Sequence, residues 1–161
     1  MVERERLGIY LTDHLAGSSA GVDLAERLRA ENEGTRFGEV LTELVEEIRQ
    51  DRAMLEALID KLGIEKSPVK QAVGWGFEKV SRLRLNKQLL GSEDLTTLLE
   101  TESLSLGIEG KRLMWVALRE AAAGDERLAA TDFDRLIGRA RTQRAALEPH
   151  RLAAARRAFT A

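Results

Sequence analysis

Apolar residues recur at spacings of three and four along most of the chain, which is the period of an amphipathic α-helix. Residues typical of helix ends divide this pattern into segments. The first predicted helix runs from about Glu3 to Asn32 and stops at Gly34. The second starts after Thr35, a possible N-cap, and ends at Gly63. No stretch alternates apolar and polar residues for long enough to indicate a strand.

Two more helices follow in the middle of the chain. Ser67-Pro68 combines an N-cap residue with a proline in the first turn, and this pair opens a third predicted helix that ends at Gly91. Ser92 then caps a fourth helix, whose first turn contains acids that favour the helix dipole. This helix runs to about Ala123 and stops at Gly124.

A fifth helix begins at "TDFD", where Thr131 and Asp134 form a start similar to a capping box, and continues to the C-terminus. The first, second, fourth and fifth helices are long, and the third fills the connection between the second and the fourth. This order predicts an all-α fold, an antiparallel four-helix bundle with an additional crossover helix. At this length we expect one domain over residues 1–161.

Several polar residues occupy positions where a core residue is expected. His14 falls on the apolar stripe of the first helix, and Asp51 falls in the centre of the stripe of the second. Like charges four residues apart repel each other, so a row of acids on the second helix requires compensation by basic side chains or by a metal ion. That row is Glu39, Glu43, Glu47 and Asp51.

The fourth helix is apolar on two sides, which predicts burial on both. Glu102 and Glu109 lie on one side, among Leu95, Leu98, Leu99, Leu106, Leu113 and Val116. The opposite side provides a candidate homodimer face. It consists of Leu104, Ile108, Trp115 and Leu118.

The fifth helix carries Gln143 and His150 in the gaps of its apolar stripe, with Arg144 and Arg151 beside it. Glu148 and His150 are two residues apart, so they point ~200° apart around a helix and cannot chelate one ion. We therefore expect Glu148 on the surface. Pro149, between them, predicts a bend.

Charge is unevenly distributed in a chain whose formal net charge is −2. From Arg135 to Ala161 there are seven arginines and one acid, Glu148. A basic helix can bind nucleic acid, but these arginines fall all round the helix, and no aromatic residues alternate with them to stack on bases. We therefore expect the basic helix to pack among acidic ones, and no nucleic-acid partner.

Other features exclude several classes of chemistry and location. The chain has no cysteine, so disulfides and thiolate metal sites are excluded. The longest run without charged residues, His14 to Val22, is far shorter than the ~18 residues of a membrane span. The N-terminus lacks the apolar region of a signal peptide, so we expect a cytoplasmic protein. No phosphate-binding loop or Ser-His-acid arrangement is recognisable, which argues against an enzyme.

Two stretches, "LGIYLTDHLAGSSAG" and "LLETESLSLGIEGKRLMW", are similar to the first and third core helices of small bacterial ferritin-like proteins. The chain as a whole resembles this superfamily in its order of two long helices, a crossover and two more. The resemblance implies a four-helix bundle. It also implies a di-iron site made of one Glu from each of two helices and Glu-x-x-His from each of the other two.

The ligand motifs implied by this resemblance are incomplete. Glu102 matches a single-Glu position, whereas the first helix offers only Asp13 and His14. Glu47 is followed three residues later by Gln50 instead of a histidine, and His150 has no Glu three residues before it.

The first hypothesis is therefore a non-enzymatic bundle without an intact di-metal site, with a structural or protein-interaction role as a homodimer. Its inward carboxylates Asp51, Glu102 and Glu109 would pair with Arg144, Arg151 or Lys87. The alternative is an iron- or manganese-binding oxidase or storage protein. Its non-standard ligands would be Glu47, Asp51, Glu102, Glu109, His14 and His150.

Overall fold

The computed structural model describes residues 3–65 and 92–160, and every regular element within these ranges is a helix. The all-α prediction is confirmed for this part of the chain. The predicted helix between Ser67 and Gly91 lies outside the described residues. None of the described helices is long and apolar enough to cross a membrane. The helices are α1 (Arg4–Glu31), α2 (Arg36–Lys61), α4 (Glu93–Ala122), the short α5 (Glu126–Ala129) and α6 (Phe133–Phe159).

Most helix starts agree with the capping signals. The Thr35 hydroxyl accepts a hydrogen bond from the Gly38 amide (3.1 Å), and Ser92 does the same at the start of α4. The predicted N-cap of the last helix, Thr131, is wrong. Asp132, not Thr131, accepts a hydrogen bond from the Arg135 amide (3.0 Å) because its carboxylate reaches the first free amides of α6. The short α5, capped by Asp125, was not predicted.

Two glycines are required by the geometry of helix ends. Gly63 has φ of 64°, and its amide bonds to the Asp60 carbonyl while the Ile64 amide bonds to Ile59, so α2 ends in a Schellman motif. Gly38 lies at the corner between α1 and α2, where a Cβ atom would come 2.2 Å from the Asn32 carbonyl oxygen. A side chain at either position would distort the turn.

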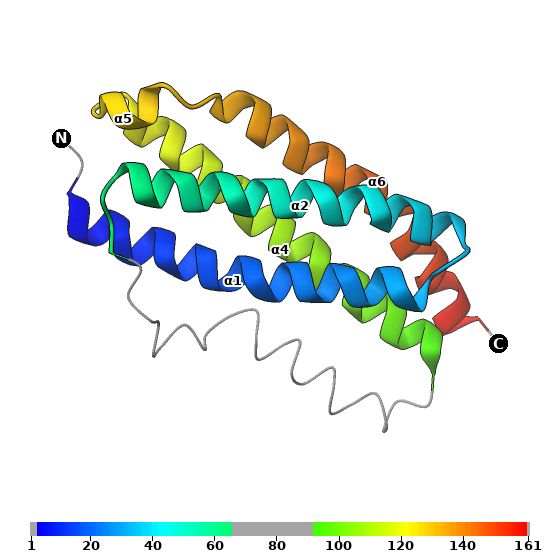
Figure 1. Cartoon of the computed structure of the whole chain (residues 1–161). Helices are drawn as coiled ribbons and strands as arrows, with labels where there is room; N and C mark the ends of the chain where they lie inside the picture. The colour runs from blue at the N-terminus through cyan, green and yellow to red at the C-terminus, as the bar shows by residue number, and fades with distance from the viewer. Residues whose placement is uncertain (1–2, 66–91, 161) are drawn as a thin grey trace.

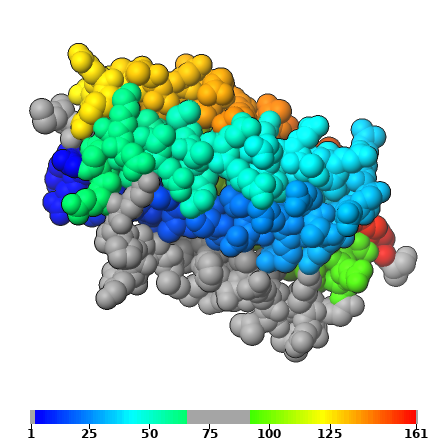
Figure 2. Space-filling model, viewed as in Figure 1, coloured from blue at the N-terminus to red at the C-terminus, as the bar shows by residue number. Residues whose placement is uncertain are grey.

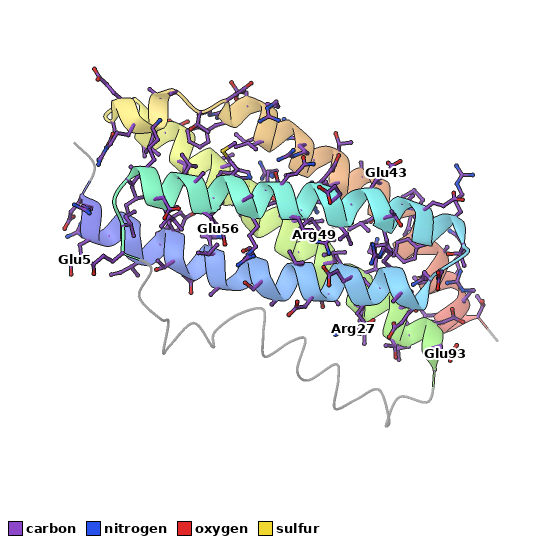
Figure 3. The ribbon with its side chains drawn as sticks, viewed as in Figure 1. Glu5, Arg27, Glu43, Arg49, Glu56 and Glu93 are labelled. Carbon is purple, nitrogen blue, oxygen red and sulfur yellow. The ribbon has the colours of Figure 1, made fainter. Side chains whose placement is uncertain are left out.

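The long helices pack as two pairs, α1 with α2 and α4 with α6, and the pairs meet through contacts of α1 with α4 and of α2 with α6. Neighbouring helices run antiparallel, and α2 ends at the opposite end of the molecule from the start of α4 (Figure 1). In the view of Figure 2, α1 and α2 form the face toward the reader. Acidic and basic side chains project outward along these helices, Glu43 among them (Figure 3).

The apolar core of the described residues is divided into two clusters along the helix axes. One cluster contains Leu11, Leu55 and Trp115, and the other contains Leu28, Leu41 and Ile108. Each long helix contributes to both clusters, and on α2 the buried apolar stripe is interrupted between the residues of one cluster and those of the other. The gap on α2 lies between Ile48 and Leu55, where the sequence places Asp51.

The two apolar sides of α4 differ in burial. The predicted homodimer face, Leu104, Ile108, Trp115 and Leu118, is fully buried because this side of α4 faces the other helices, so it is not available to a partner. The opposite side was predicted to be core, yet Leu106 and Leu113 are 57% and 52% exposed. Glu102 and Glu109 lie on this side and are therefore partly exposed instead of inward-facing.

Pro149 lies inside α6, and the helix continues through it. Proline has no amide hydrogen, so the carbonyl of Ala145 loses its usual partner within the helix. Pro149 and Ala145 are both exposed, and water can satisfy this carbonyl.

Candidate functional site: a buried charge network

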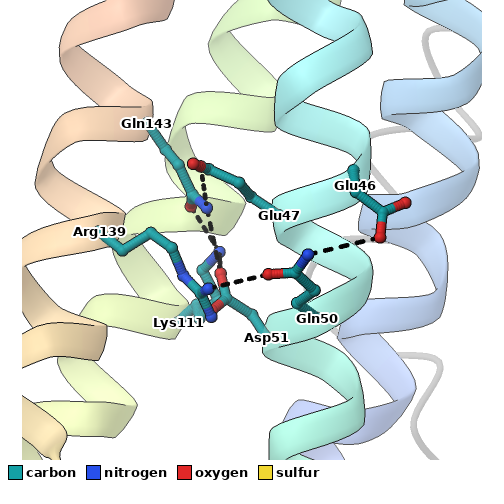
Figure 4. Close-up of polar contacts among 7 residues, drawn as sticks. All are labelled: Glu46, Glu47, Gln50, Asp51, Lys111, Arg139 and Gln143. Atoms are coloured by element: carbon teal, nitrogen blue, oxygen red, sulfur yellow. Dashed lines mark hydrogen bonds and ion pairs between the residues drawn. The ribbon is translucent and has the colours of Figure 1, made fainter.

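Asp51 is the centre of a network of polar side chains from α2, α4 and α6 (Figure 4). The residue is 1% exposed. The Nζ atom of Lys111 donates to Oδ2 at 2.5 Å, and the guanidinium of Arg139 donates to Oδ1. A buried carboxylate is costly unless it is paired and hydrogen-bonded, and here both of its oxygens face a cation.

Gln143 connects the members of this network. Its side-chain oxygen accepts from Lys111 Nζ at 2.7 Å, while its amide nitrogen donates to Glu47 Oε2 at 3.0 Å and to Asp51 Oδ2 at 3.2 Å. The amide thus presents its negative end to the ammonium and its positive end to the two carboxylates. With two acids and two bases, Glu47, Asp51, Lys111 and Arg139, the network carries no net formal charge.

The network continues toward the surface through Arg139. Its guanidinium donates to Gln50 Oε1 at 3.2 Å, and Gln50 in turn donates to Glu46 at 3.4 Å (Figure 4). Gln50 and Glu46 are exposed, so this branch joins the buried charges to solvent. Arg139 therefore binds Asp51 on the inner side and a surface amide on the outer side.

Burial is the main influence on the pKa of Lys111. Removal from water lowers this pKa below its ordinary value, and the charge of Arg139 acts in the same direction. The carboxylate of Asp51 opposes both effects through its charge and its hydrogen bond. Asp51 therefore favours the charged form of Lys111 against the effect of burial.

Residue spacing explains why these side chains meet. Lys111 follows Ile108 by three residues and precedes Trp115 by four, so it lies on the buried stripe of α4. Gln143 follows Ala140 by three and precedes Leu147 by four, and it is buried in α6. Lys111 falls between the two apolar clusters, because Ile108 belongs to one and Trp115 to the other. Gln143 lies within the cluster that contains Ile108, between Ala140 and Leu147, and reaches Asp51 from there.

The predicted partners are wrong for Asp51, which pairs with Lys111 and Arg139 because these bases align with it across the bundle. Glu102 and Glu109 bind arginines of α6, as the sequence predicts. Arg151 donates to Glu102 at 3.1 Å, and Arg144 donates to Glu109 at 2.6 Å. Glu109 also binds Arg112 of its own helix, and this hydrogen bond is the main cause that lowers the pKa of Glu109. The third predicted base, Lys87, lies outside the described residues.

The two histidines contact aromatic rings. His14 meets Tyr10 edge to face, with ring centroids 4.7 Å apart, and His150 stacks on Phe37 of α2 with centroids 4.5 Å apart. Burial lowers the pKa of His14, although the charge of Asp13 opposes the shift. Burial and the charge of Arg36 lower the pKa of His150.

Among the six candidate metal ligands, hydrogen bonds join only Glu47 and Asp51, both through Gln143. The described residues contain no group of three or more His, Asp or Glu side chains arranged to hold a metal ion. Glu148 lies on the surface, as expected from its position two residues from His150 on the helix. It binds Arg151 at 2.7 Å.

Sequence reasoning missed Lys111, Arg139 and Glu100 as partners in buried ion pairs, although Lys111 and Glu100 had a positional signal. Lys111 lies three residues after buried Ile108 and four before buried Trp115, which is the signal that identified Asp51. Arg139 follows buried Leu136 by three residues, but the residues at the same spacings after it are the polar Thr142 and Gln143. Glu100 lies four residues before Leu104, is 2% exposed, and accepts a hydrogen bond from Arg27 of α1 at 3.0 Å.

We expect His150 to titrate below its ordinary pKa of 6.5, and Arg36→Gln to raise its pKa because a neighbouring positive charge is removed. The folded state favours the neutral ring. The contribution of His150 to stability is therefore complete above the unfolded pKa and is lost as the pH falls from there through the folded pKa. NMR titration of the ring protons measures this value. Arg135→Gln, at the other end of α6, is the control and should leave it unchanged.

No protein-family model matches the chain, and no curated protein or solved structure is significantly similar to it. The function must therefore be inferred from the arrangement of its own residues.

Proposed function

We propose that the protein is a single-domain, ferritin-like four-helix bundle without an intact di-metal site, and that it has a structural or protein-interaction role as a homo-oligomer. The observation that carries the proposal is the pairing of Asp51. Its two oxygens are bound by Lys111, Arg139 and Gln143, so the carboxylate neutralises protein cations.

The position of the network supports this reading. Metal centres in bundles are built from inward side chains on facing helices. Here α2, α4 and α6 contribute such side chains between the two apolar clusters, and two of them are cations. Glu102 and Glu109, the other candidate carboxylates, bind Arg151 and Arg144. A salt-bridge network thus fills the space that metal ligands would need.

The alternative function, binding of iron or manganese by Glu47, Asp51, Glu102, Glu109, His14 and His150, requires several of these contacts to break. A divalent cation at Asp51 would have to displace the ammonium of Lys111 and the guanidinium of Arg139. Like charges at such distances repel strongly in a buried site. The two histidines would also have to leave the rings of Tyr10 and Phe37.

The basic helix α6 supports a structural role for its arginines. Arg139, Arg144 and Arg157 pair with acids of α2 or α4. These contacts use part of the charge that a nucleic acid would need. We therefore propose no nucleic-acid partner.

Metal addition distinguishes the two functions. We expect protein purified without chelator to contain no stoichiometric iron, manganese or zinc, and its Tm to stay constant when these ions are added. By contrast, a metal at ~100 times its Kd would stabilise the fold by ~2.7 kcal/mol, a shift of several degrees. The measurements are elemental analysis and a thermal melt at each ion concentration.

Two variants make the metal test specific. A bound metal, or a rise in Tm that Asp51→Asn abolishes and Glu43→Gln retains, would establish the alternative function. Glu43 is the matched control because it is an exposed acid on the same helix, two turns before Asp51. A rise in Tm that survives both substitutions would indicate a site elsewhere, and that result would also contradict the proposal.

A further inference from the structure

One side of α6 carries a stripe of exposed residues that no other described helix covers. Its residues Ala145, Glu148, Pro149, Leu152 and Arg156 line a surface depression. Leu152 is 42% exposed and Phe159 is 71% exposed. Residues seven apart share a helix face, so Phe159 extends the same stripe by two turns beyond Leu152.

We propose that this stripe is the contact surface for a second copy of the same chain, with α6 of each copy antiparallel to the other and a two-fold axis at Leu152. This inference rests on the proposed homo-oligomer and names its surface. A two-fold contact requires a surface that complements itself. The order of residues on either side of Leu152 meets that requirement.

The first complementary pair is electrostatic. Glu148 lies four residues before Leu152, and Arg156 lies four residues after it. At 1.5 Å per residue, both are ~6 Å from the axis, so in an antiparallel pair Glu148 of one copy is level with Arg156 of the other. The two-fold axis produces this contact twice. Arg156 has no ion-pair partner within residues 3–65 and 92–160, and the Glu148 side chain is 49% exposed.

The second complementary pair is steric. Ala145 lies seven residues before Leu152 and Phe159 lies seven residues after it, ~10 Å from the axis on either side. The large exposed ring of Phe159 on one copy is therefore level with the small Ala145 of the other, in the depression beside Pro149. At the axis, Leu152 meets its own counterpart. Apolar contacts at the centre with charged pairs beside them are the usual composition of an interface.

A surface of this size favours a weak dimer, because a single pair of helices buries less than a standard interface. We expect the wild-type protein to change from monomer to dimer between about 1 µM and 1 mM in sedimentation velocity. Leu152→Glu should raise the dissociation constant by about thirty-fold or more, as expected for a central apolar contact. Leu113→Glu, on the exposed side of α4, is the matched control and should leave dimerisation unchanged.

Charge exchange identifies the geometry of the contact. Glu148→Arg alone should weaken the dimer because the introduced arginine would face Arg156 of the other copy, and Arg156→Glu alone should weaken it because two acids would meet. When the two variants are mixed in equal amounts, both contacts become attractive again, and a heterodimer should form with wild-type affinity. Circular dichroism of each variant confirms that it is folded.

Several outcomes would overturn the inference. These are a wild-type protein that is monomeric at all concentrations, a Leu152→Glu variant that still dimerises, or a mixture of charge variants that remains monomeric. The first outcome would also remove the homo-oligomer from the proposed function. The second and third would leave a dimer with another surface. None of them affects the metal test, so the absence of a di-metal site is tested independently of the dimer surface.

Discussion

Asp51→Leu is expected to lower the free energy of unfolding by about 3–5 kcal/mol, because it leaves two cations without their carboxylate inside the protein. The Lys111 and Arg139 side chains are each 16% exposed, so water replaces little of the lost interaction. Urea denaturation followed by circular dichroism measures the loss. A loss below about 1 kcal/mol would mean that the network does not form in solution.

Two further variants interpret this result. Glu43→Leu removes an exposed acid from the same helix and should change stability by no more than about 0.5 kcal/mol. The triple variant Asp51→Leu, Lys111→Met, Arg139→Leu removes the buried ion pairs as a unit, and it should recover most of the stability that Asp51→Leu loses. A triple variant less stable than Asp51→Leu would show that the three residues do not act together.

Trp115→Ala is expected to destabilise the protein by about 3–5 kcal/mol, because it leaves a large cavity in one of the two apolar clusters. Trp115 is fully buried and packs near Phe133, with ring centroids 6.3 Å apart. The same urea denaturation measures the effect. Leu113→Ala, an exposed apolar residue on α4, is the control and should have little effect.

Trp115→Phe distinguishes the contribution of ring packing from the cost of burying the indole N–H group. The indole Nε1 of Trp115 is buried and has no hydrogen-bond partner within the described ranges. Removing this N–H group offsets part of the lost packing, so Trp115→Phe should cost clearly less than Trp115→Ala. Equal losses for the two variants would indicate that ring contacts contribute little to this cluster.

Helix boundaries could be predicted from the sequence because they depend on local chemistry. Thr35 and Ser92 cap their helices through amides only three residues away, and Gly63 ends α2 with its own backbone. The prediction failed at Thr131 and Asp132, where two adjacent residues can both cap and only the path of the chain decides between them. The burial of Asp51 was also predictable, since apolar residues lie on both sides of it.

The partners of Asp51 could not be predicted with the same reasoning, because they depend on how three helices align laterally. The sequence left basic side chains and a metal as alternatives. It also could not determine which apolar side of α4 is the core. Apolar residues recur at helical spacing on both sides. The side that contacts α1 and α6 is buried and contains Trp115, whereas the other side is exposed and contains Leu113.

The charged layer between the two apolar clusters also has a consequence for the alignment of the helices along their axes. Leucine-rich stripes tolerate sliding, since one apolar side chain can replace another. If α4 shifted by one turn, ~5.4 Å, Lys111 would lie beside Ile48 or Leu55 instead of Asp51. Each such shift separates the Lys111 ammonium from Asp51 Oδ2 and breaks a buried ion pair. The network therefore selects one axial register among the many that hydrophobic packing alone would allow.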